Sequence, residues 1–186
     1  YTQHAITEYE QMIEFDAINP WYKARLGLIY NGLYQRTQKE EFKTLALENT
    51  RLTTINDPKN PLFTLHYAHL LYKYGMIDQA KSYYLKTVKF DNELTEAHFN
   101  LAKSYKDLGR LPEAETTYNN YLQHHPNDTA ALYNLANLLA EENRMDEAEA
   151  TFHTLLAEAP DHLDGKHNLA LLLYRQGKPK DALALL

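Results

Sequence analysis

Four sets of residues recur along the chain at a spacing of 34 positions, and this period constrains the fold more than any other feature. Two sets are Ala, one is Gly or Asn, and one is Pro or Asn. The sets are Ala68, Ala102, Ala136 and Ala170; Ala80, Ala114, Ala148 and Ala182; Gly75, Gly109, Asn143 and Gly177; and Pro58, Asn92, Pro126 and Pro160. Four sets with one shared period indicate an array of similar structural repeats.

Each set has a physical role in a pair of helices. Apolar residues occur at helical spacing, for example at Leu132, Leu135 and Leu139. Asn143, or Gly at the related positions, is expected to end the first helix because these residues best tolerate a left-handed backbone. A second helix follows, and Pro160 stops it. The Ala positions are small because two helices cross there and must approach closely.

Composition supports a helical fold and sets aside several classes of protein. Gly and Pro are sparse, with 6 and 7 residues in a chain of 186, which favours long helices over a turn-rich β fold. The net charge of −6 is modest, and no cluster of Lys and Arg indicates a nucleic-acid surface. Because the chain has no Cys, it has no disulfides, thiolate zinc sites or Cys nucleophile. The longest apolar run is far shorter than the ~20 residues that span a bilayer.

The repeats resemble the tetratricopeptide repeat family. The best match is residues 129–162, TAALYNLANLLAEENRMDEAEATFHTLLAEAPDH. The resemblance implies an all-α solenoid, a right-handed superhelix of antiparallel helix pairs. We place further repeats at 61–94 and 95–128 and a partial repeat at 163–186.

Upstream of residue 61 the pattern is looser. We interpret residues 20–60 as a degenerate, longer repeat, in which NPWYKARLGLIY resembles a first helix and residues 41–55 form a late partner after the polar stretch QRTQKEE. Residues 1–19 are interpreted as the second helix of a preceding repeat whose first helix is absent. The residues expected on its apolar side are Ala5, Ile6, Tyr9, Ile13 and Phe15 or Ala17. The chain does not begin with Met, so we expect it to be a piece of a longer protein.

Stacked helix pairs create a concave groove, and in the family the first helix of each pair lines it. The resemblance therefore implies which positions contact a partner. They are Leu65, His66, His69, Tyr72, Phe99, Asn100, Lys103, Lys106, Tyr133, Asn134, Asn137, Glu141, His167, Asn168, Leu171, Tyr174 and Arg175.

Asn100, Asn134 and Asn168 occupy the same place in three repeats, although Asn costs a helix a few tenths of a kcal/mol, roughly, relative to Ala. A carboxamide is both donor and acceptor, so it can pair with the backbone of an extended peptide, as several members of the family do. The structural alternative is that each Asn binds the neighbouring helix pair. A clamp for a C-terminal carboxylate, found in chaperone-binding members, is not expected. Asp164, Asn168 and aromatic residues stand where it needs Lys and Arg.

No pattern of residues in the sequence indicates a catalytic site. His66 and His69 lie three apart on one predicted helical face, but no third metal ligand is evident. The chain has no nucleophile elbow, phosphate loop or metal-protease helix. We therefore expect no enzymatic activity, no metal and no cofactor.

The leading hypothesis is a protein–protein interaction scaffold that binds a peptide or partner segment in the concave groove. One alternative is a non-catalytic appendage of a larger enzyme, such as a glycosyltransferase or a membrane-embedded envelope-glycan polymerase or ligase. Another is a scaffold that self-assembles through its apolar C-terminal end. We expect a soluble segment that binds no nucleic acid and does not itself insert into a membrane, in either the cytoplasm or the periplasm. The partner stays open, because a shared fold does not specify what it binds.

Overall fold

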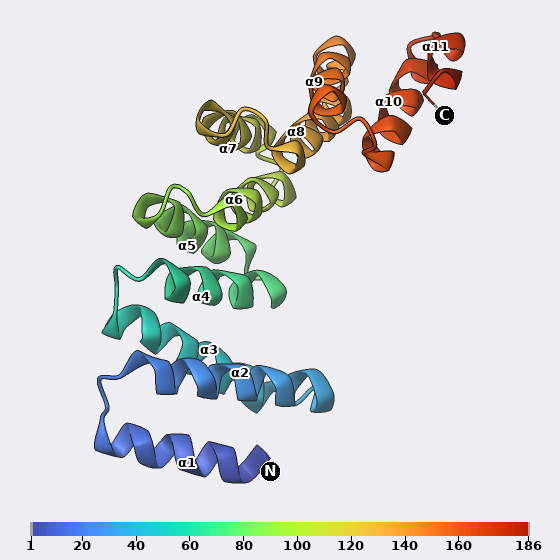
Figure 1. Ribbon diagram of the computed structural model, residues 1–186. Coiled ribbons are helices and arrows are strands. Elements are labelled where there is room, and N and C mark those ends of the chain that lie inside the picture. The colour runs from blue at the N-terminus through green and yellow to red at the C-terminus, as the bar shows by residue number, and fades with distance from the viewer. Residues whose placement is uncertain (1, 186) are drawn as a thin grey trace. The chain divides into compact units, whose positions relative to one another are not determined.

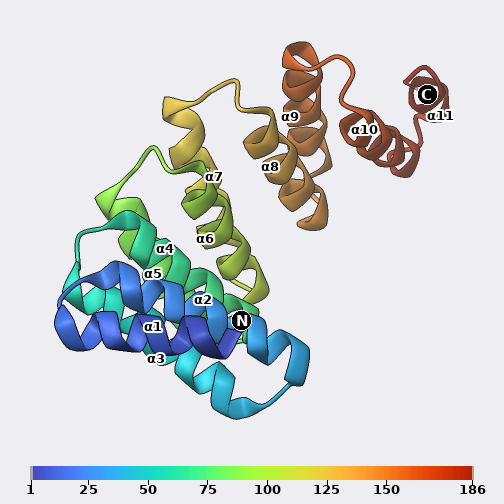
Figure 2. The same cartoon turned by 60° about the horizontal axis from the view of Figure 1, so that its bottom comes forward.

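The computed structural model describes residues 2–185, in which eleven α-helices and no β-strand occur (Figures 1 and 2). The chain divides into two compact bodies, residues 1–97 and residues 98–186, which we call the N-terminal body and the C-terminal body. Within residues 2–185 no helix is both long enough and apolar enough to cross a membrane.

The N-terminal body is built from helices that pack on their neighbours in sequence. These are α1 (Thr2–Phe15), α2 (Pro20–Thr37), α3 (Glu40–Asn56), α4 (Pro61–Lys73) and α5 (Ile77–Phe90). Two of them start with the same device. The side-chain oxygens of Asn19 and Asn60 accept hydrogen bonds of 3.1 Å from the backbone N–H groups of Trp21 and Leu62. A Pro follows each Asn, where a missing N–H costs nothing.

The pair α2 and α3 is longer than the later pairs, with 18 and 17 residues against 13 and 14 in α8 and α9. The polar stretch that we interpreted as a separator is mostly helical: α2 continues to Thr37, and α3 begins at Glu40. The turn between them is made by Gln38, which has a left-handed φ of 56°. At the crossing of the two helices stands Gly27, where any Cβ would collide with the hydroxyl of Thr50.

Helix α1 confirms the predicted amphipathic segment in part. Ile6 is buried, and Tyr9 and Ile13 pack against the same core. The expectation for Phe15 and Ala17 is wrong. Phe15 is 96% exposed in the last turn of α1, and Ala17 is exposed beyond the end of the helix.

The C-terminal body contains most of α6 (Thr95–Asp107) and five further helices. These are α7 (Leu111–His124), α8 (Thr129–Glu141), α9 (Met145–Glu158), α10 (Leu163–Arg175) and α11 (Pro179–Leu183). Its core is mainly Leu and Ala, with the ring of Phe152 near its centre. Ala136 and Ala148, at two of the repeated small positions, are fully buried.

The prediction for the residues that end the first helices is confirmed in every repeat from residue 61 onward. Asn143 has a φ of 61°, and Gly75, Gly109 and Gly177 have values of 79°, 72° and 77°. This backbone returns the chain sharply, so that the second helix of each pair can pack on the first.

An arginine joins three helices of the C-terminal body. Arg144 precedes α9, and its guanidinium contacts Glu115 of α7 at 2.6 Å, Glu147 of α9 at 2.6 Å and Glu142 after α8 at 3.1 Å. The hydrogen bonds that Arg144 donates to Glu147 and Glu115 raise the pKa of Arg144 above its ordinary value. We call this set of four residues the Arg144 hub.

Candidate functional site

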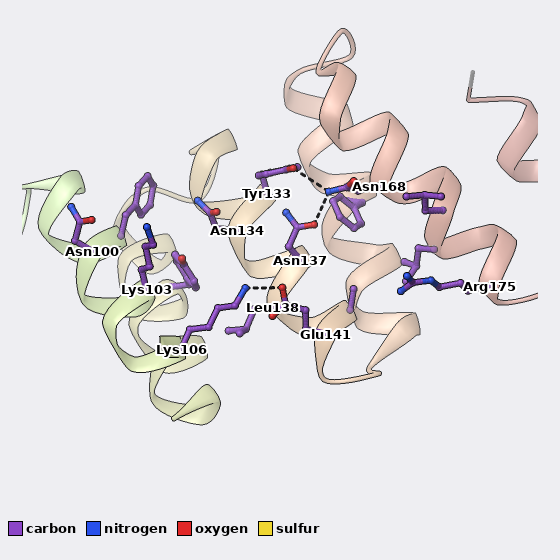
Figure 3. Close-up of a pocket in the computed structure, with 16 residues that line it drawn as sticks. Asn100, Lys103, Lys106, Tyr133, Asn134, Asn137, Leu138, Glu141, Asn168 and Arg175 are labelled. Atoms are coloured by element: carbon purple, nitrogen blue, oxygen red, sulfur yellow. Dashed lines mark hydrogen bonds and ion pairs between the residues drawn. The ribbon is translucent and has the colours of Figure 1, made fainter. Parts of the chain in front are cut away.

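The C-terminal body contains a hollow of about 530 Å³, which we call the groove (Figure 3). Side chains of the first helices α6, α8 and α10 supply most of its lining, and rings from the second helices α7 and α9 complete it. The lining residues are Phe99, Asn100, Lys103, Lys106, Tyr118, Tyr133, Asn134, Asn137, Leu138, Ala140, Glu141, Phe152, Asn168, Leu171, Leu172 and Arg175.

Helical periodicity explains this lining. On each first helix the contributing residues recur at intervals of three or four positions, as with Asn134, Asn137 and Glu141, and some have an adjacent residue in the lining too, so they form one broad face. The opposite face of α8 carries Leu132 and Leu139, which are buried in the core.

Eleven of the predicted partner-contact residues line the groove. Leu65, His66, His69 and Tyr72 instead lie on α4, in the N-terminal body. Leu65 is only 7% exposed, because its side chain packs in the hydrophobic core. His167 and Tyr174 line a second hollow of about 340 Å³ formed by α10 and α11.

Five lining residues were missed by the sequence analysis: Tyr118, Leu138, Ala140, Phe152 and Leu172. Tyr118 and Phe152 lie on second helices, which the family pattern does not assign to the groove. Their spacing of 34 positions in the sequence is the signal that could have identified them.

Asn168 connects α10 to α8. Its Nδ2 donates to the hydroxyl of Tyr133 at 3.1 Å and to Oδ1 of Asn137 at 2.8 Å (Figure 3). This contact matches the structural interpretation of the repeated Asn, in which the amide binds the neighbouring helix pair.

Asn134 behaves differently, although it occupies the same place in the repeat. Its Nδ2 donates to the carbonyl of Ala130, in its own helix, at 2.8 Å. One repeat earlier, Phe99 and Lys103 replace Tyr133 and Asn137, and neither side chain offers an acceptor. Within residues 2–185, the side-chain oxygen of Asn134 accepts no hydrogen bond, so an acceptor remains on the groove wall.

The groove carries charge as well as amides. Nζ of Lys106 donates to a carboxylate oxygen of Glu141 at 2.6 Å, which joins α6 to α8. Lys103 and Arg175 are the other charged lining residues, so cations predominate. Burial, and then the nearby Glu141, raises the pKa of Tyr118 to about 12, so its hydroxyl stays protonated at neutral pH.

The two histidines of α4 are partly buried. Burial lowers the pKa of His66 and of His69, so both favour the neutral form. Nε2 of His69 lies 3.4 Å from a carboxylate oxygen of Glu96, and its ring lies 5.5 Å from that of Tyr84. In the part of the chain that the structure describes, no three His, Asp or Glu side chains gather in a metal-binding arrangement.

Antiparallel helix pairs with small residues at their crossings and left-handed residues at their turns define a helical-repeat solenoid. Sequence profiles of the tetratricopeptide repeat match residues 99–162 and residues 139–186. Residues 99–186 therefore contain tetratricopeptide repeats. The fold of this repeat is typically a non-catalytic protein-interaction fold.

Solved structures share this fold at low sequence identity. YrrB, a tetratricopeptide repeat protein with an unusual peptide-binding site, has a TM-score of 0.69 at 18% identity, covering 95% of this chain and 88% of its own. PilF of Pseudomonas aeruginosa has a TM-score of 0.71 at 17% identity, covering 99% and 81%. MamA of Desulfovibrio magneticus RS-1 has a TM-score of 0.67 at 14% identity, covering 86% and 90%. Among curated proteins, none matches the sequence.

Proposed function

We propose that the C-terminal body is a protein-interaction module that binds an extended peptide segment of a partner in the groove. The observation that carries this proposal is the lining itself. Four carboxamides from three consecutive first helices surround a hollow that also has aromatic rings in its wall. Such a surface offers polar contacts to a peptide backbone and apolar contacts to its side chains.

The amides are suited to a backbone because they do not depend on the ligand's side chains. The oxygen of Asn134 can accept from a peptide N–H, and a carboxamide N–H can donate to a peptide carbonyl. Each such hydrogen bond contributes about 0.5–1.5 kcal/mol net. Asn137 and Asn168 are already bonded to one another, so they hold the wall in place while Asn134 is the more available group.

The rings give the groove an apolar side. Phe99 and Tyr133 are partly exposed, and Phe152 is buried beneath Tyr133 with ring centroids 6.4 Å apart. Burial of an apolar ligand side chain against these rings stabilises a complex by about 25 cal/mol per Å². The peptide-binding site of YrrB, on a similar fold, also supports the proposal.

The appendage and self-assembly hypotheses stay predictions. Leu171, Tyr174 and Leu183, which line the second hollow, are exposed, and light scattering over a range of concentrations would test self-association directly. Neither hypothesis conflicts with peptide binding in the groove.

The test is a selection of random octapeptides displayed on phage, followed by affinity measurements on the enriched sequences. Asn134→Ala is expected to weaken binding about five- to tenfold, equivalent to one lost hydrogen bond. Asn120→Ala, an exposed Asn on α7 outside the groove, is the matched control and is expected to bind as the original chain does.

A second variant tests the location by steric occlusion. Ala140→Trp places an indole in the groove and is expected to abolish binding while circular dichroism and melting stay near those of the original chain. The proposal is wrong if no peptide is enriched, or if both groove variants bind as tightly as Asn120→Ala.

A further inference from the structure

We infer that the peptide taken by the groove is acidic, and that a carboxylate of the ligand replaces Glu141 at Lys106. This inference rests on the proposed function and adds the chemical class of the ligand. It follows from the distribution of charge and from the geometry of one ion pair.

The charge of the groove is opposite to that of the chain. Across the sequence, Asp and Glu outnumber Lys and Arg by 25 to 19. In the groove the order is reversed, because three cationic side chains (Lys103, Lys106 and Arg175) and one carboxylate (Glu141) line it. A cleft lined by one sign of charge raises the local concentration of oppositely charged ligands and speeds their association. The groove is therefore electrostatically complementary to an acidic segment.

The Lys106–Glu141 pair shows where a ligand carboxylate would sit. Nζ of Lys106 holds a carboxylate oxygen at 2.6 Å within the groove, a short charge-assisted hydrogen bond (Figure 3). The two side chains are 42% and 51% exposed, so the pair is open to water and adds little to stability. A weak, accessible internal pair can be exchanged for a pair with the ligand.

Arg175 provides a second cation two repeats beyond Lys106. It occupies the same place in its repeat as Glu141, and it lines the groove from α10. A guanidinium binds carboxylates through two parallel hydrogen bonds, which adds specificity to charge. First helices about 10 Å apart, and a peptide that rises about 3.3 Å per residue, place roughly six ligand residues between α6 and α10.

The same cations and rings do not favour single-stranded nucleic acid as the occupant. A nucleic-acid site neutralises several consecutive phosphates, whereas here the carboxylate of Glu141 lines the same groove as the cations, on a chain with a net charge of −6. A peptide with separated carboxylates can place its charges at Lys106 and Arg175 and its neutral backbone at the amides between them.

The experiment uses the octapeptides selected on the original chain, with affinities measured at 50 and 300 mM NaCl. The enriched peptides are expected to contain an excess of Asp and Glu and to bind more weakly at the higher salt. Lys106→Gln and Arg175→Gln are each expected to weaken binding at least about fivefold. Lys166→Gln, on α10 but outside the groove, is the matched control and is expected to have no such effect.

The decisive variant is Glu141→Gln, which keeps the size of the side chain and removes its charge. Because this variant loses the internal competitor for Lys106, acidic peptides are expected to bind about three- to fivefold more tightly. Glu158→Gln, an exposed carboxylate of α9, is the control for a general charge effect.

The outcomes separate this inference from the proposed function. Enrichment of neutral or basic peptides that still depend on Asn134 would overturn the acidic ligand and leave peptide binding intact. Unchanged or weaker binding by Glu141→Gln would overturn the exchange at Lys106. Binding of a dT20 oligonucleotide more tightly than any peptide would overturn the acidic peptide as the occupant, whereas enrichment of no peptide would overturn both proposals.

Discussion

Helices α4 and α8 are first helices of repeats two periods apart, and they share a packing frame while presenting different faces. Ala68 and Ala136 are both fully buried at the crossing with the second helix. Tyr84 and Phe152, at equivalent places on the second helices, are both buried to within 1%. The repeat therefore preserves the positions that hold each pair together.

The faces of the two helices differ at three equivalent positions that the resemblance assigns to the groove. Where α4 has Leu65, His66 and His69, α8 has Tyr133, Asn134 and Asn137. Leu65 is buried and burial favours the neutral form of both histidines, whereas the residues of α8 line the groove. The comparison teaches that the frame specifies the fold, and that a few substitutions on one face specify whether a surface can recognise a ligand.

Substitutions at the buried positions that the two repeats share should have the largest effects on stability. Tyr84→Ala and Phe152→Ala should each lower the free energy of unfolding by about 3–5 kcal/mol, because each removes a ring from a close-packed core. Urea unfolding followed by circular dichroism measures both. Fluorescence of Trp21, the single Trp of the chain, reports the N-terminal body, where its ring packs 4.9 Å from that of Phe63.

If either variant lowered the free energy of unfolding by less than about 1 kcal/mol, that position would be loosely packed. The two repeats would then not share the same packing frame. The exposed His153→Ala on α9 is the control, expected within about 0.5 kcal/mol of the original chain.

The next largest effect on stability should distinguish two asparagines that occupy the same place in their repeats. Asn168→Ala should cost about 1–2 kcal/mol, since it removes two hydrogen bonds between helix pairs and leaves Asn137 without its donor. Asn134→Ala should change stability by less than about 0.5 kcal/mol, because its bond to its own helix is offset by the better helix propensity of Ala. Equal costs, measured by urea unfolding, would show that the two asparagines play one structural role.

The two histidines of α4 should make the stability of the N-terminal body depend on pH, and α8 has no histidine to do the same. The pKa values of His66 and His69 are lowered from 6.5, chiefly by burial. The stability that comes from keeping them neutral is therefore present above pH 6.5 and is lost as the pH falls through the lowered values. Thermal melts of the original chain and of His66→Gln/His69→Gln at pH 7.5 and 5.5 measure this change.

The double variant should lose less stability on acidification than the original chain does. His153→Gln, which replaces an exposed histidine of α9, is the control. An equal loss in the double variant and the original chain would contradict the desolvation of these two rings.

The smallest expected effect is at the ion pair of the groove. Lys106→Gln should cost less than about 1 kcal/mol of stability, and less still at high salt, because both partners are about half exposed. A larger, salt-independent cost in urea unfolding would show that Lys106 stabilises the fold and is unavailable for exchange.

Much of the fold was predictable because the repeat imposes the same physical needs at each period. The left-handed turns at Gly75 and Asn143 follow from residue type at a fixed place in the repeat, and so does the burial of Ala136. Gln38 escaped prediction because a left-handed Gln is uncommon, so nothing in its residue type marks the end of α2.

The sequence predicted which residues line the candidate site, but not which hydrogen bonds these residues make. The resemblance to the repeat family, carried over position by position, was enough to place Asn134 and Asn168 in the groove. Their different bonding depends on whether the previous repeat offers acceptors, as Tyr133 does and Phe99 does not. Such pairings between repeats require a comparison of neighbouring positions, which a single helix pattern does not include.

The Arg144 hub has a consequence for how tightly a ligand can be held. By joining residues of α7 and α9 to the turn that follows α8, it restrains the helices whose side chains line much of the groove. A wall that is already ordered loses little conformational entropy when a peptide binds, so more of the contact energy appears as affinity. A preorganised groove of this kind would let a peptide bind without rearrangement of the helices. Differences in affinity between peptides would then appear mostly in their dissociation rates.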